Sequence, residues 1–185
     1  QKTRKVTKTI SLKSGVKVFA KRFDLSLSEF KVPTLEEFIE LIQGLNKSRG
    51  VDVGIYPELK SPEFHMQNGK DIAKIVFPIL EQYGYNKKNA NIFVQCFYPP
   101  TLKRLRFEFK AKMPLVALIA ENEWNESSID YDRLKTQEGM RELSEFVDGI
   151  GPYMSQLYTN DEKLRKTNLV EIAHRYKLKV HSYTH

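Results

Sequence analysis

The sequence contains one cysteine, no glycine-rich phosphate loop and no long hydrophobic run. Because Cys96 is the only cysteine, no disulfide can form within the chain. This residue lies in a hydrophobic segment, residues 91–97, with no activating base close to it in the sequence, so we expect a buried and unreactive thiol. No hydrophobic run approaches the roughly 18 residues of a membrane-spanning helix, and we predict no such helix in this chain.

The positive charge of the chain is concentrated at one end. The net charge is +7 and the isoelectric point is about 9.3, yet residues 1–33 contain nine basic and two acidic residues, whereas residues 34–185 contain 21 of each. A terminal cluster differs from the basic stripe that follows a nucleic-acid backbone, so we predict no nucleic-acid partner. We interpret residues 1–33 as a basic arm that leads into one folded domain over residues 34–185. A weaker hypothesis, binding of an anionic surface through this arm, predicts affinity that falls steeply with salt.

Hydrophobic runs and helical periodicity alternate along residues 34–185. We predict strands at residues 51–56, 91–97, 114–120, 148–151 and 178–183, and helices at residues 34–47, 69–83, 101–110, 136–147 and 160–176. This alternation, with almost no hairpin signal, indicates an α/β fold with parallel strands. The chain is too short for a complete eight-stranded barrel, which takes about 250 residues. An open doubly wound sheet is the competing topology, although the G-x-G-x-x-G and Walker motifs typical of it are absent.

A carboxylate and an ammonium group stand two residues apart after the first predicted strand. Glu58 and Lys60 follow residues 51–56, and Pro62 then ends the strand and predicts an exit turn in the loop at residues 61–65. The alternation of side chains along a strand places Glu58 and Lys60 on the same side. Such a pair suits the binding of a cation and a phosphate together, while the alternative is an ion pair of structural value only.

Residues 56–73, which read YPELKSPEFHMQNGKDIA, resemble the bacterial periplasmic glycerophosphodiester phosphodiesterases. Further blocks match in the same order, at residues 83–85, 95–97, 102–104, 118–120, 124–126, 148–152 and 180–184. The resemblance implies a TIM (β/α)8 barrel of the phosphodiesterase type, with a metal-dependent site at the C-terminal ends of the strands. It also implies that the barrel is incomplete in this chain, an internal fragment with about strands three to seven.

The resemblance assigns two site residues by position. Glu58 is similar to a carboxylate ligand of the family's divalent cation, and Lys60 is similar to the lysine beside the phosphate. The cation is commonly Ca²⁺ in the periplasmic branch, with Mg²⁺ as the alternative, and two further carboxylates come from an E-x-D pair. The family also uses an N-terminal His-Arg pair and a second histidine as general acid and base. Residues 1–50 contain none of these, so we predict no catalytic residue in this chain and no turnover by it alone.

Four further candidates lie on predicted strands. Gln95 and Phe97 share one face of a strand end, where the amide could orient a substrate hydroxyl or could equally be a satisfied amide between barrel layers. His181 and Tyr183 share a face of the last strand. In relatives an aromatic residue at the Tyr183 position packs on the glycerol side of the pocket, which makes Tyr183 the stronger candidate and His181 a weak one.

The remaining candidates lie in predicted loops. His65 follows the strand exit, where it either lines the pocket or is a solvated loop histidine. Trp124 follows a hydrophobic strand and either caps the mouth of the barrel or covers core. The acidic residues around it, Glu121, Glu123 and Glu126, are interpreted as a solvated loop and not as a second metal site.

The resemblance implies an enzyme that hydrolyses glycerophosphodiesters to glycerol 3-phosphate and an alcohol. Its partners would be small-molecule substrates. We expect it in the periplasm or at the outer surface of a bacterial cell, with a possible lipid anchor outside this chain. The chain begins at Gln1, so the lack of a signal peptide says nothing about export. The alternative hypothesis is a non-catalytic surface lipoprotein or binding protein of the same fold.

Overall fold

The computed structural model describes residues 32–159 and 164–183, and the chain divides into two compact units, residues 1–49 and residues 50–185. The described part of the first unit contains one helix, α1 (Leu35–Arg49). Its start is a capping box, because the Thr34 hydroxyl accepts from the Glu37 backbone N–H and the Glu37 carboxylate accepts from the Thr34 N–H. The helix predicted over residues 34–47 is therefore confirmed. The basic arm falls largely outside the described residues and stays a prediction.

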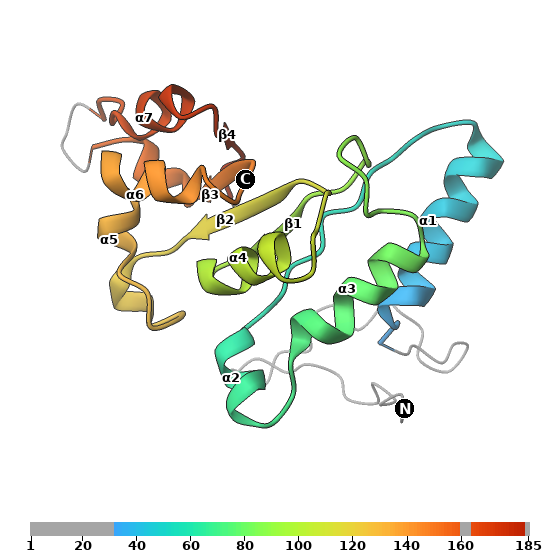
Figure 1. Cartoon of the computed structure of the whole chain (residues 1–185). Helices are drawn as coiled ribbons and strands as arrows, with labels where there is room; N and C mark the ends of the chain where they lie inside the picture. The colour runs from blue at the N-terminus through green and yellow to red at the C-terminus, as the bar shows by residue number, and fades with distance from the viewer. Residues whose placement is uncertain (1–31, 160–163, 184–185) are drawn as a thin grey trace, which may run out of the picture. The chain divides into compact units, whose positions relative to one another are not determined.

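The second unit is built on a parallel sheet. Its strands lie in the order β1 (Val94–Cys96), β2 (Leu115–Ile119), β3 (Gly149–Pro152) and β4 (Lys179–Val180), as Figure 1 shows. Its helices are α2 (Pro62–Gln67), α3 (Ile72–Gln82), α4 (Pro99–Phe107), α5 (Tyr131–Leu134), α6 (Gln137–Leu143) and α7 (Leu169–Arg175), with 3₁₀ turns η1 (Asn122–Trp124) and η2 (Met154–Leu157). Each strand is followed by helical structure before the next, as predicted for βα repeats.

A fifth segment pairs with the free edge of β1, but a proline interrupts its ladder. Parallel bridges join Ile55 to Ile92 and Glu58 to Gln95 in one register. Four of the expected backbone hydrogen bonds are present, and the missing one would need an N–H on Pro57, which has none. The strand predicted over residues 51–56 is therefore wrong in part: pairing begins only at Ile55, and Val51 and Val53 are exposed.

The sheet is strongly curved. In a flat sheet, four strand spacings would separate the Ile55 segment from β4 by about 19 Å. Yet the Tyr56 hydroxyl lies 2.8 Å from Nδ1 of His181, which directly follows β4, and the Phe93 ring lies 4.6 Å from the His181 ring. Side chains from the two outer segments can meet only if the sheet curves around them, as in an arc of a barrel.

Two glycines make room on the inner face of this arc. Gly149 and Gly151 lie on β3, next to Val116 and Leu118 of β2. A Cβ atom at Gly151 would lie 2.6 Å from Cδ2 of Leu118. On the other face Val94, Cys96, Leu115 and Ala117 are buried, and α4 contacts β1 and β2. The sheet therefore carries helices on its outer face, and aromatic, polar and aliphatic side chains together with the two glycines on its inner face.

Several helix predictions need correction. The predicted exit loop at residues 61–65 instead begins α2, since Ser61 turns the chain in the left-handed region (φ 44°) and Pro62 occupies the first helical turn. The helix predicted over 69–83 begins later, at Ile72, and α3 continues through Pro78 to Gln82. The helix predicted over 136–147 is shorter in the structure, since Thr136 caps α6 and this helix ends at Leu143, and α5 is a separate short helix before it.

The last predicted helix, residues 160–176, is shorter in the structure. Residues 160–163 lie outside the described residues, and α7 begins only at Leu169. Leu164, within the predicted helix, is 67% exposed with a φ of 41°. A residue in that backbone conformation cannot continue a right-handed helix.

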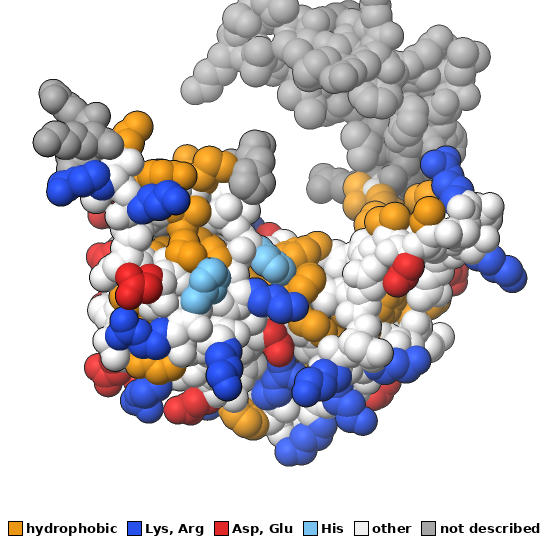
Figure 2. Space-filling model, turned by 90° about the horizontal axis from the view of Figure 1, so that it is seen from above, with side chains coloured by type: hydrophobic (Ala, Val, Ile, Leu, Met, Phe, Trp, Pro, Cys, Tyr) orange, Lys and Arg blue, Asp and Glu red, His pale blue; other side chains and the backbone are white. Residues whose placement is uncertain are grey.

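The surface mixes both signs of charge. Figure 2 shows a face on which basic and acidic side chains both occur beside histidines and hydrophobic side chains. Among the described helices, none is both long and hydrophobic enough to cross a membrane.

We predict that Gly151→Ala destabilises the fold. The added methyl meets Leu118 at 2.6 Å and the His181 carbonyl at 3.2 Å, so the free energy of unfolding should fall by about 1–3 kcal/mol, measured by urea denaturation. In a Leu118→Ala background the same change should cost much less, because the clashing Cδ2 atom is gone. An equal cost in both backgrounds would contradict the packing described for the inner face.

Candidate active site

Three charged side chains converge at the end of the Ile55 segment. The Lys60 ammonium lies 2.6 Å from a carboxylate oxygen of Glu126 and 3.5 Å from one of Glu58. Glu58 and Glu126 are partly buried, with 30% and 22% of their side chains exposed. The two predicted site residues, Glu58 and Lys60, thus lie side by side as the strand alternation required. Glu126, interpreted from the sequence as part of a solvated loop, completes the group.

The carboxylates keep Lys60 charged. Burial works to lower the pKa of Lys60, but its hydrogen bond to Glu126 and the charges of Glu58 and Glu126 outweigh burial and raise the pKa above its usual value. The ammonium also lies 5.0 Å from the centre of the Phe97 ring, a cation–π distance. A lysine in this state is a fixed positive charge and not a proton acceptor at neutral pH.

An aromatic wall continues from Lys60 along the inner face. The ring of Phe97 meets Tyr183 edge-on at 5.7 Å, Tyr183 lies 5.9 Å from Tyr153, and Tyr153 meets Trp124 edge-on at 5.2 Å. Tyr183 also donates a hydrogen bond to the Ile119 carbonyl at 2.8 Å, and burial raises its pKa. Phe97, Tyr183 and Trp124 were sequence candidates, and the structure joins them into one surface through Tyr153, which the sequence did not single out.

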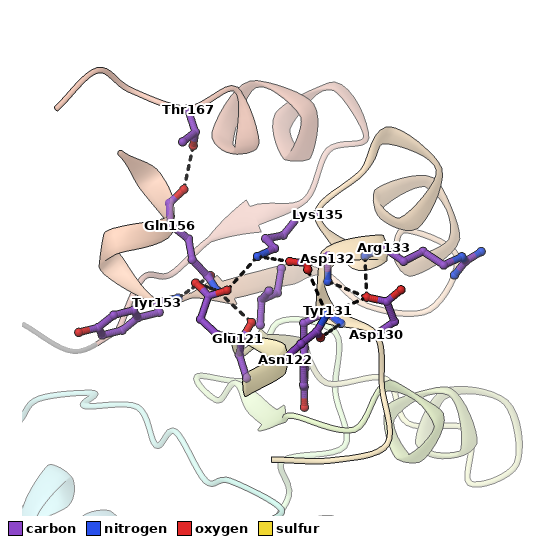
Figure 3. A network of polar contacts seen from close by, with 12 residues as sticks. Glu121, Asn122, Asp130, Tyr131, Asp132, Arg133, Lys135, Tyr153, Gln156 and Thr167 are labelled. Carbon is purple, nitrogen blue, oxygen red and sulfur yellow. Dashed lines mark hydrogen bonds and ion pairs between the residues drawn. The ribbon is translucent and has the colours of Figure 1, made fainter. Parts of the chain in front are cut away.

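The loop that carries Glu126 is fixed by an extensive polar network. Glu121 accepts hydrogen bonds from Lys135 at 3.0 Å and from the buried Gln156 at 2.9 Å, as Figure 3 shows. Asn122 accepts from the Tyr131 N–H and donates to Asp130. Of the three acids assigned to a solvated loop, only Glu123 is exposed, because Glu121 is tied to this network and Glu126 to Lys60.

A second set of contacts fixes the residues next to Glu126. Tyr131 is 1% exposed and its hydroxyl donates to the Phe97 carbonyl at 2.9 Å and bonds Ser127 at 2.6 Å. Ser128 donates from its N–H and its hydroxyl to Glu63 of α2 at 2.9 and 2.6 Å. The loop is therefore joined to the end of β1 and to the helix that follows Lys60.

The other predicted candidates lie at different distances from this group. Gln95 is bridged through its backbone to Glu58, on the same face as Phe97. His181 lies deeper on the inner face, where it bonds Tyr56. His65 lies on α2 against Phe64, and no described contact joins it to Glu58 or Lys60.

Cys96 behaves as the sequence indicated. Its side chain is fully buried, and its thiol donates to the Leu59 carbonyl at 3.2 Å. Burial raises its pKa to about 12, so the thiolate needed for nucleophilic chemistry does not form at neutral pH.

The group supplies hard oxygen donors but too few of them for a metal ion. Ca²⁺ and Mg²⁺ prefer carboxylate oxygens, which Glu58 offers. Over residues 32–159 and 164–183, however, no three acidic, histidine or cysteine side chains are grouped so that they could hold a metal. The described residues thus fit one part of such a site, and the remaining ligands would have to come from elsewhere.

Comparison with known proteins decides the family. The model of the glycerophosphoryl diester phosphodiesterase family matches residues 3–185. The chain belongs to this family. It is similar to the glycerophosphodiester phosphodiesterases of Haemophilus influenzae (38% identical, covering 97% of this chain and 55% of that protein) and Treponema pallidum (29% identical, covering 90% and 52%). The chain thus spans about half the length of the curated relatives it matches.

A solved structure supports the same fold for this member of the family. A chain from Silicibacter pomeroyi DSS-3, assigned as a glycerophosphoryl diester phosphodiesterase, superposes with a TM-score of 0.61 at 20% identity. The match covers 84% of this chain and 46% of that one. The fold is therefore α/β of the TIM-barrel type, and the described strands form an arc and not a closed barrel.

We predict that Tyr131→Phe weakens the fold around Glu126. The hydroxyl is the described partner of the Phe97 carbonyl, so its loss should lower the free energy of unfolding by about 1–2 kcal/mol in urea denaturation. Tyr158→Phe is the matched control, since Tyr158 is 43% exposed and should change stability little. Equal effects of the two substitutions would show that this hydrogen bond does not anchor the loop.

His181 should make stability depend on pH. Burial, and then the charge of Lys179, lower the pKa of His181 below its ordinary value of 6.5. The unfolded chain therefore binds this proton more readily, so the stabilising effect of neutral His181 is complete above pH 6.5 and is lost as the pH falls below it.

The test compares urea denaturation at pH 5.5 and 7.5 for His181→Gln, with His174→Gln on the exposed face of α7 as the control. His181→Gln should reduce the loss of stability at pH 5.5, and His174→Gln should leave it as in the wild type. An unchanged pH dependence in His181→Gln would contradict the burial of this ring in the inner face.

Proposed function

We propose that the whole protein hydrolyses glycerophosphodiesters to glycerol 3-phosphate and an alcohol with the help of a divalent cation. Membership of the family and the likeness to relatives that carry this name support the proposal. The observation that carries it in this chain is the joint placement of Glu58 and Lys60 beside the aromatic wall of Phe97 and Tyr183.

The charge of this group supports the requirement for a cation. Glu58, Lys60 and Glu126 together carry a net charge of −1, because two carboxylates face one ammonium. A phosphodiester also carries one negative charge and would be repelled by the group as it stands. A divalent cation on Glu58 reverses the sign, which makes the site attractive to the substrate.

Each residue of the site has a role in the proposed reaction. Glu58 would hold the cation, Ca²⁺ with Mg²⁺ as the alternative, and a bound cation polarises a phosphoryl oxygen and neutralises charge on it. Lys60 adds a fixed positive contact to the phosphate. Phe97 and Tyr183 offer an apolar wall for the glycerol carbons, and the Gln95 amide orients a hydroxyl. We assign the general acid and base to no described residue.

The proposed location rests on the resemblance to periplasmic enzymes alone. We propose the periplasm or the outer cell surface, with a lipid anchor outside this chain, and fractionation of cells that make the protein tests it. No observation on the described residues favours the alternative of a non-catalytic surface lipoprotein.

We predict that Glu58→Gln in the full-length protein removes cation-dependent hydrolysis while the fold stays intact. The amide keeps the shape of the side chain but loses the charge that holds the cation, so kcat/KM should fall by about 100-fold or more. The assay measures glycerol 3-phosphate released from glycerophosphocholine as Ca²⁺ is varied, with a chelator as the metal-free reference.

Glu108→Gln provides the control, because Glu108 is an exposed carboxylate beyond α4 that pairs with Arg104. Its rate should match that of the wild type. If Glu58→Gln also retained the wild-type rate, Glu58 would have no part in the reaction. An inactive wild type would remove the proposed function itself.

A further inference from the structure

We propose that Glu126 is a positioning residue that fixes the Lys60 ammonium for phosphate binding. This inference rests on the function proposed above. It assigns a role to Glu126, a loop carboxylate that the sequence pattern around Glu58 and Lys60 does not identify.

Lys60 needs such a partner because its side chain is long and largely exposed. A lysine carries its charge on a flexible four-carbon stem, and 58% of this side chain is exposed. The Glu58 oxygen lies 3.5 Å away, whereas the Glu126 oxygen lies 2.6 Å away and is the shortest contact of the ammonium. Of the two carboxylates, Glu126 therefore makes the shorter contact and restricts the position of the Lys60 ammonium more.

Glu126 can hold Lys60 because Glu126 is itself fixed. Asn125 turns the chain in the left-handed region (φ 50°) at the end of η1, directly before Glu126. The next two residues, Ser127 and Ser128, are bonded to the buried Tyr131 and to Glu63 of α2. A carboxylate whose following residues are anchored in this way loses little further freedom when it binds an ammonium.

The geometry also leaves Lys60 a free donor for the substrate. An ammonium has three N–H groups, and Glu58 and Glu126 accept from at most two of them. The Phe97 ring, 5.0 Å away, is the third described contact of the ammonium. The remaining N–H can donate to a phosphate oxygen without a change in the rotamer of Lys60.

A double-mutant cycle on the full-length protein tests this role. Glycerophosphocholine hydrolysis at saturating Ca²⁺ is compared among the wild type, Glu126→Ala, Lys60→Met and the double variant. Glu126→Ala should lower kcat/KM by about 10-fold, and in the Lys60→Met background it should change it by less than about twofold. Glu126→Asp, which keeps the charge, should recover part of the loss.

Glu123→Ala is the matched control from the same loop, because Glu123 is exposed and makes no ion pair with the described residues. Its activity should stay within about twofold of the wild type. The inference is overturned if Glu126→Ala also stays in that range. It is equally overturned if Glu126→Ala costs as much without Lys60 as with it, since Glu126 would then act on something else.

A second measurement does not depend on catalysis. Because the Glu126 carboxylate holds the Lys60 ammonium at 2.6 Å, Glu126→Ala should leave the Lys60 side chain disordered in a crystal structure of the full-length protein. Glu123→Ala should leave that side chain as well ordered as in the wild type. A Lys60 side chain equally ordered in Glu126→Ala would overturn the inference, whereas an inactive wild type with the expected loss of order would remove only the proposed function.

Discussion

The parallel ladder between the Ile55 segment and β1 is the constraint on which the site depends. Its register places Glu58 opposite Gln95 and brings Lys60 over Phe97. A slip of one residue would turn every side chain of the segment to the other face, with Leu59 inside and the charged pair among the helices. The ladder tolerates Pro57 because the flanking hydrogen bonds stay in one register and only one bond is lost.

The curvature of the sheet makes one site from residues far apart in the sequence. Lys60 precedes α2, Glu126 follows η1 and Tyr183 follows β4, yet all three lie around Phe97. Deeper in the arc, Tyr56 reaches His181 across the same sheet. The glycines of β3 allow this approach, because a side chain at Gly151 would collide with Leu118. The backbone thus sets both the wall and the charged group at the ends of the strands.

Several features of the fold and of the candidate site could be predicted from the sequence. Strand alternation predicted that Glu58 and Lys60 share a side, and the hydrophobic run at residues 114–120 predicted the strand β2, which is buried on both faces. Sequence patterns failed to predict the structure where contacts between distant segments determine it. Val51 and Val53 have strand propensity, but the ladder with β1 begins at Ile55 and both valine side chains are exposed. Glu126 looked like one of three loop acids, and its contact with Lys60 depends on Tyr131 and Ser128, whose partners lie more than thirty residues away. The block at residues 124–126 was the one sequence signal that pointed to it.

A crystal structure of the full-length protein with Ca²⁺ and glycerol 3-phosphate tests directly whether Glu58 and Lys60 bind the cation and the phosphate. A Ca²⁺ ion should lie about 2.3–2.6 Å from a Glu58 carboxylate oxygen. A phosphate oxygen should be in hydrogen-bond contact with Lys60, with the glycerol carbons against Tyr183. A calcium ion bound away from Glu58, or a phosphate that does not contact Lys60, would contradict this assignment.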